Sequence, residues 1–79
     1  MRFAGIDIAS ETHVVAVVDE NAEVRLKPLA FAEDATGYAK LLAALGSPAG
    51  VLVAMEATGH YWKNLFATLA AHDYAVTLI

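Results

Sequence analysis

The continuous apolar run Val51–Met55 constrains the fold of this chain more than any other feature of its sequence. A strand without polar alternation is typical of a parallel sheet that is covered on both faces. Parallel neighbours must be joined by a long crossover, which is usually a helix. A segment with apolar residues at helical spacing lies on each side of the run: Tyr38, Leu41, Leu42 and Leu45 before it, and Trp62, Leu65, Phe66 and Leu69 after it. The pattern therefore predicts an α/β protein.

Three strands are predicted before the first helix. Phe3–Ile8 is typical of a buried strand, and His13–Asp19 forms the second. Val24–Lys27 alternates polar and apolar residues and is expected to end at Pro28, as a charged edge strand should. Between the second and third strands, Asn21 is the residue best suited to a left-handed conformation. The short connections predict an antiparallel meander.

Helix and strand alternate after the meander. Asp34 is predicted to cap the first helix, Glu33 is assigned to the same capping role, and Gly46 is predicted to end the helix. A last strand is expected over Tyr74–Ile79. Right-handed crossovers then give a mixed sheet of order 3-2-1-4-5. Because the last strand leaves one sheet edge uncovered, we expect a fold that is truncated after its fifth strand.

Length and composition limit the possible functions. Seventy-nine residues, 58% of them hydrophobic, make one domain over residues 1–79 with enough apolar side chains for a core. No apolar run approaches the roughly 18 residues of a membrane span, so no membrane partner is expected. The absence of cysteine fits a reducing cytosol. A formal net charge of −4 predicts that the chain alone binds nucleic acid poorly.

Two acidic residues are predicted at the carboxyl ends of neighbouring parallel strands. Asp7 closes the first strand, and Glu56 follows Val51–Met55. Ligands bind outside such strand ends, and adjacent strands lie about 4.8 Å apart, so the two carboxylates are expected to meet. Their hard oxygens suit Mg²⁺ or Mn²⁺. The alternative is that Asp7 caps the turn over Ser10–Thr12 and that Glu56 interacts with backbone donors at a helix start. An unpaired carboxylate within an apolar run is costly, which favours a compensating ligand.

Three segments of the chain resemble a known family. They are Gly5–Ser10, Thr12–Val14 and, above all, Met55–Tyr61 with the letters Met-Glu-Ala-Thr-Gly-His-Tyr. These segments are similar to the amino-terminal motifs of the DEDD transposases of the insertion sequence one-ten type, relatives of the Piv-type invertases of pilin genes. The resemblance covers nearly the whole chain. The segment around Glu56 is its specific part, whereas Gly5-Ile6-Asp7 alone is a weak signal.

The resemblance implies a ribonuclease H-like fold of the RuvC type, with Asp7 and Glu56 as the first two of four metal-binding acids. The other two, both aspartates, would lie beyond Ile79, so the two-metal site for Mg²⁺ or Mn²⁺ would be incomplete in this chain. The full-length protein is then expected to catalyse metal-dependent DNA cleavage and strand transfer, and the chain alone is expected to be inactive.

The same resemblance implies partners and location. DNA would bind through the full-length protein, a separate carboxyl-terminal domain would supply a nucleophilic serine, and some relatives are guided by a structured RNA. We expect a homo-oligomer in the prokaryotic cytoplasm, associated with the nucleoid. Two positions depart from the family pattern. Asp73 replaces a common glycine, a change that we interpret as neutral, and Ala9–Glu11 lacks a lysine that many relatives carry.

Two other functions stay open at this stage. The small lobe of an actin-like or sugar-kinase-like ATPase shares the strand order, but it requires a glycine-rich phosphate loop where this chain has Ala9-Ser10-Glu11. A non-catalytic module would instead oligomerise through the exposed edge that begins after Tyr74. Three histidines lack the spacing of metal ligands and are expected to be structural or exposed: His13, His60 and His72.

Overall fold

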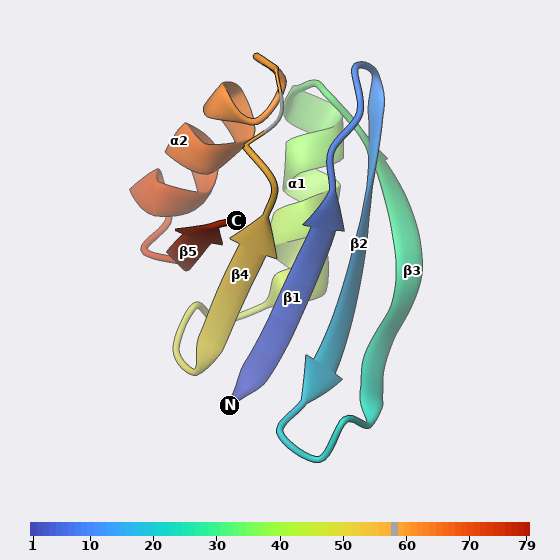
Figure 1. Cartoon of the computed structure of the whole chain (residues 1–79), viewed down its shortest axis with the longest axis vertical. Helices are drawn as coiled ribbons and strands as arrows, with labels where there is room; N and C mark the ends of the chain where they lie inside the picture. The colour runs from blue at the N-terminus through green and yellow to red at the C-terminus, as the bar shows by residue number, and fades with distance from the viewer. Residues whose placement is uncertain (58) are drawn as a thin grey trace.

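The fold is a five-stranded mixed sheet with two helices on one of its faces (Figure 1). The computed structural model describes residues 1–57 and 59–79. The elements, in chain order, are β1 (Arg2–Asp7), β2 (Thr12–Asp19), β3 (Val24–Ala32), α1 (Ala35–Leu45), β4 (Val51–Met55), α2 (Lys63–Ala71) and β5 (Ala75–Leu78). The sheet order β3-β2-β1-β4-β5 confirms the predicted topology and is consistent with a ribonuclease H-like fold.

The first three strands form the predicted antiparallel meander. The turn between β2 and β3 is organised by the carboxylate of Asp19, which accepts the backbone N–H of Asn21 at 2.9 Å and that of Glu23 at 3.0 Å. The Glu23 amide is the main cause that lowers the pKa of Asp19. The left-handed residue is Ala22, with φ 62°, and not Asn21 as predicted. The reason is that the Ala22 N–H also donates to the Asp19 carbonyl, which fixes the turn around Asp19.

The third strand runs through Pro28 to Ala32, so the prediction that it ends at Pro28 is wrong. Val17 lies opposite Leu26, whereas Val15 lies opposite Leu29, so β3 holds one extra residue between these two pairs. A bulge in an edge strand tolerates a residue that has no N–H to donate. The strand therefore continues through Pro28 as a bulged edge strand.

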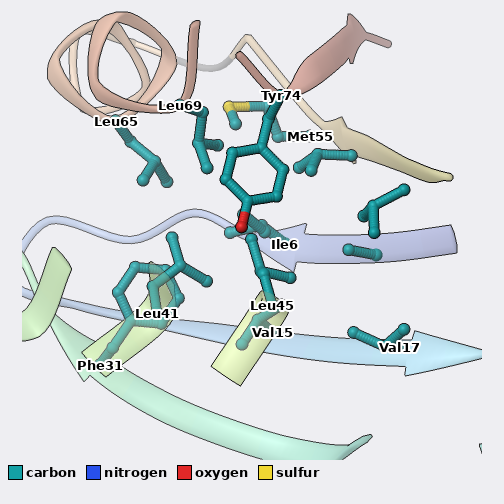
Figure 2. Packing of buried hydrophobic residues seen from close by; sticks show 13 residues of the cluster. Ile6, Val15, Val17, Phe31, Leu41, Leu45, Met55, Leu65, Leu69 and Tyr74 are labelled. Carbon is teal, nitrogen blue, oxygen red and sulfur yellow. The ribbon is translucent and has the colours of Figure 1, made fainter. Parts of the chain in front are cut away.

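The strands β1, β4 and β5 are parallel, as predicted. Both crossovers move in the same direction along the sheet, so right-handed connections place α1 and α2 on the same face. The core lies between this face and the helices (Figure 2). Its fully buried residues of large volume include Phe31, Leu41, Leu45, Val15, Val53, Met55, Leu65 and Leu69. The Tyr74 hydroxyl adds a hydrogen bond across the core to the carbonyl of Gly46.

The strands β1 and β4 are covered on one face only, whereas β4 was predicted to be covered on both faces. Ala4 and Ile6 are buried against the helices, but Phe3 points to the other face and is 40% exposed. Small and apolar side chains from three strands line an open groove of about 370 Å³ on that face. The sequences of β1 and β4 show no polar alternation because apolar side chains also line the open face, which the helices do not cover.

The ends of the helices follow the sequence signals. The carboxylate of Asp34 accepts the N–H of Gly37 at 2.7 Å, which confirms the predicted cap. Gly46 ends α1 with φ 72°, and Asp73 after α2 takes the left-handed conformation, with φ 66°, that aspartate tolerates. Across residues 1–57 and 59–79, neither helix has the length and apolar character needed to cross a membrane.

Gly37→Ala should destabilise the fold strongly. A Cβ on Gly37 would lie 1.9 Å from the carbonyl oxygen of Ala32, and backbone cannot turn aside as a side chain does. Overpacking of this kind costs about 1–3 kcal/mol or more, so urea unfolding should show a free energy of unfolding lower by about 2 kcal/mol or more. Gly5→Ala is the matched control, because nothing lies within 4 Å of its added Cβ. Equal stabilities of the two variants would contradict this packing.

Candidate metal centre

The parallel pairing of β1 with β4 brings Asp7 and Glu56 to one edge of the sheet. Ile6 lies opposite Met55 in this register. Asp7 and Glu56 are each one residue beyond that pair, at the carboxyl ends of the two strands. Figure 1 shows β1 and β4 ending side by side at this edge. Both side chains are exposed and line the same open cleft, so the two acids singled out in the sequence do lie together.

The cleft, of about 410 Å³, opens over the face of the sheet that the helices leave uncovered. Because Ile6 points into the core, strand alternation turns Asp7 toward the opposite face. Gly5 lies opposite Ala16 on one side and Ala54 on the other, and all three line the cleft. This row of small side chains leaves space directly beside the carboxylates.

The two carboxylates are suitable ligands for a hard divalent cation. Among the described residues, neither Asp7 nor Glu56 forms an ion pair, so their oxygens are not held by a basic side chain. Two like charges at one cleft repel each other, and a cation between them would relieve that repulsion. Within residues 1–57 and 59–79, no group of three or more His, Asp or Glu side chains could hold a metal ion. The pair therefore offers part of a ligand set.

A buried histidine lies behind this edge of the sheet. His13, in β2, is fully buried, as the structural role expected for it requires. Its Nδ1 accepts the backbone N–H of Ala9 at 3.1 Å, and its Nε2 lies 2.7 Å from Oε1 of Glu33. Because Nδ1 accepts, the neutral ring carries its hydrogen on Nε2 and donates it to Glu33. The ring also packs against Phe31, with a centroid distance of 5.3 Å.

The hydrogen bond between His13 and Glu33 was not predicted from the sequence, although a signal for it was present. His13 has the same strand parity as Val15 and Val17, which face the core. A polar side chain at such a position must find hydrogen-bond partners. The other two histidines, His60 and His72, are exposed. Thr58, which belongs to the Met55–Tyr61 segment of the family resemblance, lies outside the described residues.

Glu33 was predicted to cap α1, but it binds His13 instead. Burial alone would raise the pKa of Glu33, yet the polar side chains beside it, Tyr38, His13 and Asn64, outweigh burial and lower the pKa. Burial and the Glu33 carboxylate in turn raise the pKa of the Tyr38 hydroxyl. Glu33 thus remains ionised and links the connection between β3 and α1 to the buried ring of β2.

A model of a known protein family matches most of the chain. The family model of the IS110-type DEDD group, described as Transposase, matches residues 4–79. The matched range contains all of β2 to β5 and both carboxylates of the cleft. No match was found among curated proteins.

The environment of Glu33 predicts a pH dependence of stability. Its pKa in the folded chain is below the ordinary value of 4.5, so the folded state binds fewer protons than the unfolded state. The stabilisation is therefore complete above the ordinary value and is lost as the pH falls through the folded pKa. Glu33→Gln should flatten the fall in unfolding free energy between about pH 5 and 3, measured by urea unfolding. Identical slopes for the variant and the wild type would argue against an ionised, hydrogen-bonded Glu33.

Proposed function

The chain belongs to the IS110-type DEDD transposase family, and from this premise we propose that it supplies half of a metal site for DNA cleavage and strand transfer. In this proposal, Asp7 and Glu56 are two of four acids that hold Mg²⁺ or Mn²⁺. The observation that carries the proposal is that two acids far apart in the sequence follow adjacent parallel strands and line one cleft. The remaining acids would come from residues beyond Ile79.

The chemistry follows from charge and space. A bound divalent metal would activate the attacking oxygen and stabilise the leaving one in phosphodiester transfer. Without a cation, the two carboxylates would repel a phosphate by about 1 kcal/mol each at 4 Å in water. The row of Gly5, Ala16 and Ala54 leaves room for a phosphodiester beside the acids. In this proposal, the chain orients the two carboxylates and leaves the cleft open to a phosphodiester.

The rest of the protein would supply what this chain lacks. None of the described residues that line the cleft is lysine or arginine, and the formal net charge is −4. Affinity for DNA depends on basic groups that neutralise phosphates. DNA binding, and any pairing with a guide RNA, therefore belongs to the full-length protein, and the chain alone should bind metal weakly and cleave nothing.

Of the two alternatives, the ATPase lobe loses support because the family match assigns the chain to transposases. The oligomerising module keeps one observation in its favour. Apolar side chains remain exposed on the open face and at the β5 edge, with Phe3 40% and Leu78 38% exposed. Apolar surface of this kind can mediate self-association. A strict monomer in light scattering at high protein concentration would remove this alternative.

Metal titration tests the assignment of the two acids. Glu56→Gln and Asp7→Asn should each weaken Mn²⁺ binding by about tenfold, because each removes one charged ligand. Isothermal titration calorimetry at high protein concentration measures the change. Glu23→Gln is the matched control, since Glu23 is an exposed acid in the turn at the opposite end of the sheet. Wild-type heats from the two cleft variants would refute the assignment.

Cleavage by the full-length protein tests the proposed reaction. Asp7→Asn in that protein should reduce the rate of DNA strand cleavage by about 100-fold or more, because a group that stabilises the transition state is lost. Single-turnover cleavage of an end-labelled DNA substrate in Mg²⁺ measures the rate. Glu23→Gln should cleave at the wild-type rate. Cleavage by Asp7→Asn at an undiminished rate would exclude this mechanism.

A further inference from the structure

A buried polar chain lies behind the segment that follows Asp7. It runs from the backbone of Ala9 through the ring of His13 to the carboxylate of Glu33. We propose that His13 and Glu33 are positioning residues that hold the segment after Asp7 so that Asp7 and Glu56 keep metal-binding geometry. This inference rests on the proposed function, because the geometry it explains is that of the proposed metal ligands.

The first link of this chain restrains the segment after Asp7. Ala9 is beyond the last residue of β1 and makes no pair in the parallel ladder. Its N–H donates to Nδ1 of His13 at 3.1 Å. The ring of His13 is itself immobilised, because it is fully buried and packs against Phe31. The direction in which the chain leaves Asp7 is therefore fixed by a side chain in the core.

The second link joins His13 to Glu33. Glu33 accepts from Nε2 of His13 at 2.7 Å, and its own backbone N–H donates to the carbonyl of Glu11 at 2.9 Å. Glu33 and Asn64, in the first turn of α2, line the same pocket, so the carboxylate lies near the helix that follows the Glu56 segment. Glu33 thus contacts the loop that leaves Asp7 and lies beside the helix that follows Glu56.

A purely structural role would not require this chemistry. A mostly buried carboxylate is expensive to desolvate, and well-packed apolar side chains often stabilise such a position equally well. Hydrogen bonds differ from apolar packing because they fix direction as well as distance. Groups behind metal ligands orient them in this way, and their loss typically weakens metal binding by about 10- to 100-fold.

Two substitutions at His13 separate positioning from stability. In His13→Asn, the side-chain oxygen can take the place of Nδ1 and accept the Ala9 N–H, while the bond to Glu33 is lost, so this variant keeps the restraint on the Asp7 segment alone. His13→Phe fills the same volume and offers no acceptor. Mn²⁺ titration should show affinity within about threefold of wild type for His13→Asn and about tenfold weaker for His13→Phe. The folded fraction of each variant is measured in parallel by urea unfolding, so that a loss of folded protein is not mistaken for a loss of affinity.

Nuclear magnetic resonance of the wild-type chain gives a readout that needs neither metal nor folding of a variant. The His13 ring nitrogens should show hydrogen on Nε2 and none on Nδ1, and the Ala9 amide should exchange slowly with solvent. Hydrogen on Nδ1, or a rapidly exchanging Ala9 amide, would overturn the proposal. It would also be overturned by a folded His13→Phe that binds Mn²⁺ as the wild type does, or by equal losses in the two variants.

Failure of the proposed function would look different. In that case the wild type and Asp7→Asn would give the same Mn²⁺ titration, while the His13 tautomer and the protection of Ala9 stayed as described. The hydrogen-bonded chain would then be real but would position no metal ligand, and the inference would fail together with the function on which it rests.

Discussion

Every feature of the candidate site depends on the parallel pairing of β1 with β4. This pairing makes neighbours of Asp7 and Glu56, which are far apart in the sequence. The register is set by burial: Ile6 and Met55 face the helices, and a shift of one residue would turn either apolar set toward solvent. The helix α1 enforces the pairing, since its buried leucines close the core over these strands. The location of the acids is therefore a consequence of hydrophobic packing.

The one-sided coverage of the sheet suits the proposed chemistry. Burying both faces of β1 and β4 would stabilise the strands further, but it would also remove the carboxylates from solvent at a high desolvation cost. With both helices on one face, the other face stays open, and the small side chains beside Asp7 leave space for a substrate. The acids lie at the rim of an apolar surface, where they are exposed and still held by a rigid sheet.

His13 and Glu33 contribute to the stability of the core and carry the proposed positioning role. A histidine and a carboxylate in or near the core are costly unless each finds a partner, and here each satisfies the other. Their contacts extend from the loop after β1 to the connection between β3 and α1. The pair thus restrains backbone at the sheet edge in a way that the sheet's own hydrogen bonds do not.

The sequence alone determined the order of the elements, the cap at Asp34, the end of α1 at Gly46, and the placement of Asp7 and Glu56 at strand ends. These features follow from periodicity and capping, which act over a few neighbouring residues, so they can be predicted from the local sequence. Only the tertiary structure decided that Ala22 takes the left-handed turn position, that β3 passes through Pro28, that one face of the sheet stays open, and that Glu33 binds His13 instead of capping α1. Each of these depends on a contact with a distant or competing partner, and the energy of such a contact is set by register and packing that no local pattern encodes.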